Sequence, residues 1–229
     1  MNFANTCYLK FHLSVNISHV DNEYKTMKSD TYKTLKKLSE GLYKAKGSKF
    51  LAFAFPVASI NDVKPLLDEH RKKYHDARHH CYAYIIGADK SVWRVNDDGE
   101  PSGTAGKPIM GQINSLKLTN VLVVVIRYFG GTLLGTSGLI NAYKSASYNA
   151  LSKAEVIECT VNEYYKLEFQ YAAMNNIMKI IKDEDINQSD QLFELNCSMN
   201  INFRLSSKDN ILRKLGEIEN LRITFLATK

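Results

Sequence analysis

The sequence has 229 residues, of which 45% are hydrophobic and 24% are charged, with a formal net charge of +6. At roughly 150 residues per domain this length accommodates one large domain or two small ones, and a composition with only 4 prolines excludes disordered and fibrous proteins. The 4 scattered cysteines exclude a disulfide framework, and the longest apolar run, Val121–Ile126, is far shorter than the roughly 20 residues of a membrane-spanning helix. We therefore expect a soluble cytoplasmic protein that does not enter a membrane.

The first part of the chain has the weakest pattern. Residues 1–28 show no sustained period, and Met27 stands just before residues 29–38, where a helical pattern begins. Residues 1–28 are therefore predicted to be an N-terminal extension, either disordered or upstream of the true start.

The next elements carry clearer signals. Residues 49–57 are rich in aromatic residues and reach a proline near their end, which predicts a strand. Ser59 followed by Asp62 resembles a capping box and predicts a helix that runs to about Tyr74. Pro65 is tolerable in such a helix only within its first turn or two.

The middle of the chain predicts a hairpin, a long loop, a buried strand and a helix. Residues 81–86 and 91–95 are expected to pair around a turn, and a polar loop containing glycines follows at 96–108. Residues 120–128 are apolar on both faces, as a central buried strand requires. Residues 136–153 predict a helix. Its apolar stripe comprises Leu139, Ile140, Tyr143, Ala146, Ala150 and Leu151.

From residue 156 onwards the elements follow a βαββαβ order. They are strands at 158–169, about 186–193, 195–204 and 221–227, and helices at 171–183 and 207–217. This order within some 70 residues is typical of the ferredoxin-like fold. We predict an α+β protein with two domains, 29–155 and 156–229, although no linker rich in proline or glycine marks the boundary.

The basic residues are unevenly distributed. Residues 156–229 hold 9 Lys or Arg against 11 Asp or Glu, so the first 155 residues hold 21 against 13 and carry a charge of +8. This excess could attract a polyanion or form an ordinary solvated surface. The basic residues in question are Lys33, Lys36, Lys37, Lys44, Lys46, Lys49, Arg71, Lys72, Lys73 and Arg78.

Four glycines between the predicted buried strand and the following helix are a candidate anion site. Gly130, Gly131, Gly135 and Gly138 allow close approach to the backbone, and a helix N-terminus adds partial positive charge. Arg127 just before them could contact a phosphate, while Tyr128 and Phe129 could stack on bases. The alternative is that the glycines serve only a sharp turn and that the two aromatic rings lie in the core.

The loop at 96–108 contains acids and a Gly–Lys pair. A Walker A motif is excluded because Pro101 stands where the first glycine is needed and Pro108 replaces the Ser or Thr. Asp97, Asp98 and Glu100 could bind a divalent cation, but we favour turn formation or ion pairing with Arg127 or Lys107.

The cluster His75, His79, His80 and Cys81 resembles a metal site at first sight. Alternation along a strand lets only His79 and Cys81 share a face, and no CxxC or helical HxxxH accompanies them. We therefore predict packing and surface histidines, and an inert thiol in a buried strand.

Two segments together resemble the signature of the Impact/YigZ family. They are DDGEPSGTAGKPI at residues 97–109 and VVVIRYFGGTLLGTSGLINAY at residues 123–143. The resemblance covers residues 30 to 155 well and the remainder mainly by the order of its elements. It implies an N-terminal domain like the second domain of ribosomal protein S-five and the fourth domain of elongation factor G. The ferredoxin-like part would match the fifth domain of that factor.

The resemblance also implies a function in translation. Eukaryotic members of the family are linked to control of the amino-acid-starvation response at the ribosome, through competition for a kinase activator. We therefore expect a regulator that binds the ribosome, RNA or a translation-control protein, without catalytic residues, metal or cofactor. Its predicted ligand- or nucleic-acid-binding residues are Lys107, Glu100, Arg127, Tyr128, Phe129, Gly130, Gly131, Gly135, Ser137 and Gly138.

Two other hypotheses remain open from the sequence. One is a nucleotide- or phosphate-binding protein or enzyme that uses the glycine-rich 130–138 loop. The other is a protein-interaction module whose acidic C-terminal sheet, with Glu158, Glu163, Glu168 and Glu194, docks a basic partner.

Overall fold

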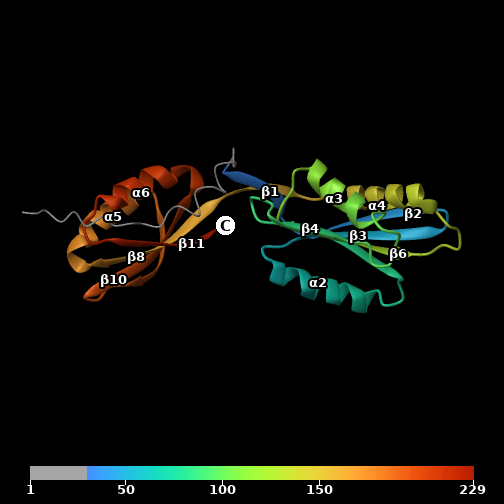
Figure 1. Ribbon diagram of the computed structural model, residues 1–229, viewed down its shortest axis with the longest axis horizontal. Helices are drawn as coiled ribbons and strands as arrows, with labels where there is room; N and C mark the ends of the chain where they lie inside the picture. Colours follow the sequence, from blue (N-terminus) through green and yellow to red (C-terminus); the bar gives the residue numbers. More distant parts are fainter. Residues whose placement is uncertain (1–29) are drawn as a thin grey trace, which may run out of the picture.

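The computed structural model describes residues 30–229, so the predicted N-terminal extension lies outside the described part of the chain. A five-stranded and a four-stranded sheet, each with its own helices, follow one another along the chain (Figure 1). Within residues 30–229 no helix is both long and apolar enough to cross a membrane. The two-domain α+β architecture expected from the sequence is confirmed.

The five-stranded sheet is antiparallel throughout, in the order β2–β3–β6–β4–β5. Two helices, α3 and α4, cover one face and α2 covers the other (Figure 1). The elements are β2 (Ser39–Ala45), β3 (Ser48–Pro56), α2 (Ile60–Lys73), β4 (His79–Ile86), β5 (Val92–Asn96), α3 (Gly106–Ser115), β6 (Val121–Tyr128) and α4 (Gly135–Leu151).

The central strand β6 is buried on both faces, as predicted. Val121, Val123 and Val125 pack under α3 and α4, while Leu122 and Val124 pack against the α2 side. A run of β-branched residues suits this position because successive side chains point to opposite faces, and here both faces are core.

The start of helix α2 follows the local sequence signal. Ser59 and Asp62 form the predicted capping box, and the helix continues through Pro65 to Lys73.

The apolar stripe of helix α4 differs from the prediction at one position. Leu139 and Tyr143 are buried as predicted, whereas Ile140 is exposed and Ala142 is buried in its place.

The four-stranded sheet has the order β11–β8–β10–β9. Its elements are β8 (Asn162–Gln170), a short 3-10 helix (Tyr171–Ala173), α5 (Met174–Asp183), β9 (Asn187–Leu192), β10 (Asn196–Arg204), a second 3-10 helix (Leu205–Ser207), α6 (Lys208–Gly216) and β11 (Arg222–Thr228). The predicted βαββαβ order is therefore confirmed. One face of the sheet packs on Ile177 and Ile181 of α5 and on Ile211 and Leu215 of α6.

Several elements differ from the sequence prediction. The helical pattern at 29–38 is wrong, because β1 (Thr31–Leu35) is a strand. The single strand expected at 158–169 is two strands, β7 (Val156–Thr160) and β8, separated at the buried Val161. Strand β2 and helix α3 were not predicted at all. The division at residue 155 stays a prediction, since the β1–β7 ribbon pairs strands from both sides of it.

Tertiary pairing explains the first two differences. Thr31 lies opposite Thr160 and Leu35 lies opposite Val156 in an antiparallel ribbon. The backbone N–H of Val161 donates to Asp30 O, and Leu205 N–H donates to Val161 O, so Val161 joins the ribbon to the four-stranded sheet. β-branched residues such as Thr31 and Thr34 favour a strand once a partner strand is present.

Candidate functional site

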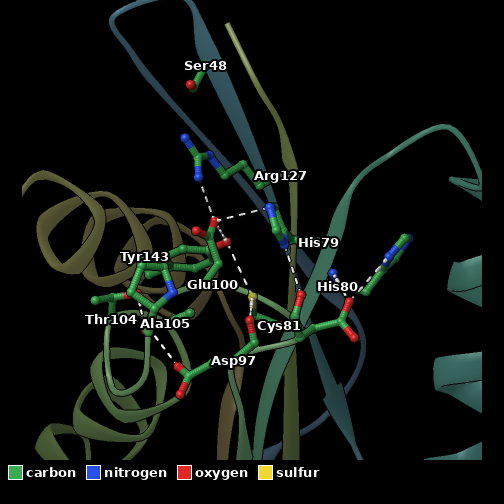
Figure 2. A network of polar contacts seen from close by, with 12 residues as sticks. Ser48, His79, His80, Cys81, Asp97, Glu100, Thr104, Ala105, Arg127 and Tyr143 are labelled. Atoms are coloured by element: carbon green, nitrogen blue, oxygen red, sulfur yellow. Dashed lines mark hydrogen bonds and ion pairs between the residues drawn. The ribbon is translucent and has the colours of Figure 1, made fainter. Parts of the chain in front are cut away.

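The two signature segments meet at one buried ion pair. Arg127, near the end of β6, donates a hydrogen bond from Nη1 to Glu100 Oε1 at 2.7 Å (Figure 2). The side chains are only 7% and 3% exposed, so the pair is largely removed from water. The predicted ion pairing of Glu100 with Arg127 is confirmed, and the loop before α3 is thereby fastened to the sheet.

Three further side chains surround Glu100. Tyr143 of α4 donates its hydroxyl to Glu100 Oε1 at 2.7 Å, and Cys81 Sγ lies 3.3 Å from the same hydroxyl. His79 Nε2 lies 4.0 Å from Glu100 Oε1, while its Nδ1 lies 2.8 Å from Asp98 O (Figure 2). Burial raises the pKa of both Tyr143 and Cys81 far above their usual ranges, so both stay protonated at neutral pH.

The histidines follow strand alternation. His79 and Cys81 of β4 face the α3 and α4 side, whereas His80 faces the other side, with its Nε2 3.1 Å from Tyr74 O. Cys81 is fully buried, as predicted for an inert thiol. Among the residues that the structure describes, no group of three or more His, Cys, Asp or Glu side chains could hold a metal ion.

The acids of the loop are structural partners, as we favoured. The carboxylate of Asp97 accepts hydrogen bonds from the N–H groups of Gly103, Ala105 and Gly106 at 2.8–3.0 Å and so supports the start of α3. Burial acts to raise the pKa of Asp97, but these donors and the charge of Lys107 outweigh it and hold the pKa below its ordinary value. Asp98 accepts the His80 N–H at 2.6 Å.

Arg127 is held below the surface rather than on it. Its guanidinium lies between the rings of Phe50 and Phe129, 5.5 Å and 5.6 Å from their centroids. Its Nε is buried without a hydrogen-bond partner. Glu100 therefore occupies the Nη1 donor of Arg127, and Arg127 is only 5% exposed, which leaves little of its guanidinium open to a phosphate from solvent. Tyr128 is half-buried and donates its hydroxyl to Asp76 at 2.8 Å, whereas Phe129 is exposed.

The glycines of the 130–138 turn have different roles. A Cβ on Gly130 would lie 1.8 Å from the carbonyl carbon of Gly47, so two backbones touch there. Gly131 and Gly135 have positive φ and open space where a Cβ would stand. Ser137 is exposed in the first turn of α4, while a Cβ on Gly138 would pack against Leu134 at 3.1 Å. The turn explains Gly130, Gly131 and Gly135 structurally, and their contact with an anion stays a prediction.

The contact between Gly47 and Gly130 brings the backbone of Lys46 close to that of Phe129, whereas Lys44 and Lys49 point to the other face of the sheet. Lys46 precedes Gly47 in the tight β2–β3 turn, and Lys44 and Lys49 lie directly opposite one another across it. Lys49 in turn lies opposite Tyr128 of β6. Lys107 is exposed in the first turn of α3, near Asp97.

The acidic C-terminal patch is only partly exposed, since Glu158 and Glu194 are exposed but Glu163 is not. Glu163 is fully buried, where it accepts hydrogen bonds from the Tyr165 hydroxyl and from Lys208 Nζ. Glu168 is paired with Lys166 at 2.9 Å. Strand alternation from the buried Tyr165 and Leu167 could have revealed Glu163, which lies on the same face. The sequence likewise gave no sign that Tyr143 and Phe50 complete the surroundings of Arg127, because their partners are distant in the chain.

Comparison with known proteins agrees with the signature segments. Residues 46–151 match the model of the Impact N-terminal domain. The IMPACT family member YigZ of Escherichia coli (strain K12) is 35% identical over 155 residues, which are 66% of this chain and 76% of the relative. IMPACT family member YvyE of Bacillus subtilis (strain 168) is 30% identical over 173 residues, covering 76% and 78% of the two chains.

A solved structure extends the similarity to both sheets. The crystal structure of a hypothetical protein aligns with a TM-score of 0.67 and 26% identity, over 86% of this chain and 98% of the other. These relatives show that the chain belongs to the Impact family, together with YigZ and YvyE.

Proposed function

We propose that this protein regulates translation in the cytoplasm by binding RNA, as presented on the ribosome, through the lysines of the β2–β3 hairpin. Membership of the Impact family supports the role in translation that the family resemblance implies. The excess of basic charge in the first 155 residues supports a polyanionic partner.

The main observation behind the proposal is that Lys44 of β2 lies directly opposite Lys49 of β3. Like charges directly opposite one another on the same face of an antiparallel pair destabilise it. Within residues 30–229, Lys44, Lys46 and Lys49 are exposed and have no acidic partner, in contrast to Lys36, which pairs with Glu155 at 2.6 Å. Phosphates bound beside these lysines would relieve this repulsion. The hairpin should therefore be more stable when it binds a polyanion than when it faces only water.

Co-sedimentation with ribosomes at low and raised salt tests the proposal. The triple variant Lys44→Gln, Lys46→Gln, Lys49→Gln should weaken the association and reduce the slope of log K against log salt by about 2, because three phosphate contacts are lost. The matched control replaces Lys153, Lys179 and Lys182, which are also exposed, and should leave the association unchanged.

Two outcomes would argue against this function. Equal losses in the two triple variants would indicate general charge attraction rather than this surface. A rise in melting temperature with ATP or GTP and magnesium, without any ribosome association, would favour the phosphate-ligand hypothesis for the 130–138 turn instead, because a ligand that binds only the native state must raise its stability.

A further inference from the structure

Phe129 is an exposed ring with a rigid support. It is 49% exposed, and one side of the ring faces the guanidinium of Arg127 at 5.6 Å. Arg127 itself rests on Phe50 and is fixed by Glu100. The ring therefore has little conformational freedom left to lose when a ligand binds, which favours affinity.

This cationic support distinguishes Phe129 from Phe193, an exposed ring in a hairpin of the four-stranded sheet. Phe193, in the β9–β10 hairpin, is 48% exposed but has neither a ring nor a cation packed against it within the described part of the chain. A cation behind an aromatic ring draws π electron density toward itself, because the face of the ring carries negative partial charge. The open side of Phe129 is then better suited to an electron-rich flat partner such as a purine.

The lysine turn lies next to this ring. Gly47 and Gly130 touch through their backbones, and Lys46 and Phe129 each immediately precede one of these glycines. Lys49 lies opposite Tyr128, so its side chain points to the α2 face, away from Arg127 and Phe129. Lys46 and the supported ring of Phe129 thus each lie one residue from a single backbone contact.

We propose that Phe129 is a stacking platform for an unpaired RNA base, and that Lys46 holds a phosphate beside that base. This inference rests on the proposed function and narrows its partner to single-stranded RNA. In a duplex the bases are already stacked on one another. The phosphates of a duplex can still contact the lysines, but no base face is free to stack on Phe129. In a single strand every base has a free face, and stacking on an aromatic side chain adds to the contacts with the backbone.

The test uses the full chain and fluorescein-labelled adenine-rich RNA, single-stranded or annealed to its complement, with affinity measured by anisotropy. Phe129→Leu keeps apolar cover over Arg127 but removes the ring, and should weaken single-strand binding about 5- to 150-fold. Its affinity for the duplex should not change. Phe129→Trp, which retains an aromatic face, should restore single-strand affinity. Phe193→Leu is the matched control and should change neither affinity.

The outcomes separate the two proposals. Equal weakening of single strand and duplex by Phe129→Leu, or an equal effect of Phe193→Leu, would overturn the stacking platform. If the triple lysine variant weakens both RNAs while Phe129→Leu changes neither, the stacking platform is wrong and the proposed function stands. If the unaltered protein binds neither RNA and does not associate with ribosomes at any salt concentration, both proposals fail. Unchanged melting temperatures of the variants would show that the fold is intact.

Discussion

Arg127 Nη1 donates to Glu100 Oε1 at 2.7 Å, and this bond joins the end of the central strand to the loop that precedes α3. The two residues belong to the two segments that carry the family signature. Since both side chains are buried, the pair forms a fixed support beneath the exposed Phe129.

Glu100→Gln should lower the free energy of unfolding by about 3–5 kcal/mol, because it leaves the Arg127 cation buried without its counter-charge. Chemical denaturation in urea measures this change. Glu217→Gln is the control, since Glu217 pairs with Arg213 at 3.3 Å on the surface and its loss should have no measurable effect. Similar small effects in both variants would contradict a structural role for the buried pair.

Tyr143→Phe removes a hydroxyl that donates to a buried carboxylate at 2.7 Å, without removing the ring that packs on Phe50. We expect a loss of about 1.5–3 kcal/mol in the free energy of unfolding, the range for a hydrogen bond to a charged group. The exposed Tyr148 provides the matched control Tyr148→Phe, which should be neutral. A neutral Tyr143→Phe would mean that the hydroxyl does not stabilise Glu100.

Asp97 should make stability depend on pH at acidic values. Its folded-state pKa is below the ordinary value of 3.8, so its contribution is fully present above that value and is lost as the pH falls through the folded-state pKa. Asp97→Asn should cost about 1–2 kcal/mol at pH 7, as removal of a helix cap does. The difference from the unaltered protein should shrink as the pH is lowered below 4. Urea denaturation between pH 7 and pH 3 measures it, and a difference that stays constant would contradict this.

Gly130→Ala and Gly131→Ala should differ in their effects on stability. At Gly130 a Cβ would meet the backbone of Gly47 at 1.8 Å, so the β2–β3 turn must move and we expect a loss of about 3 kcal/mol or more. At Gly131 there is open space, and only the positive φ of 84° opposes a side chain, at about 1–2 kcal/mol. Thermal and chemical unfolding of the two variants measure the difference. Equal effects would show that the contact between the two glycines is not tight.

The sequence alone determined the elements whose signals are local. The apolar run of β6 is buried on both faces, the Ser59–Asp62 capping box begins α2, and the βαββαβ order appears as expected. Such patterns depend on neighbours a few residues away, so they survive in any tertiary context that buries the same face.

Only the tertiary structure decided the rest. Residues 31–35 form a strand because residues 156–160 pair with them, more than a hundred positions later in the chain. Helix α3 follows a segment with two glycines and a proline, and its start is fixed by Asp97 from across a loop. Arg127 faces Glu100 and two rings instead of solvent. A side chain's hydrogen-bond partner and its exposure depend on which distant segments pack together, and the local pattern of residues does not contain that information.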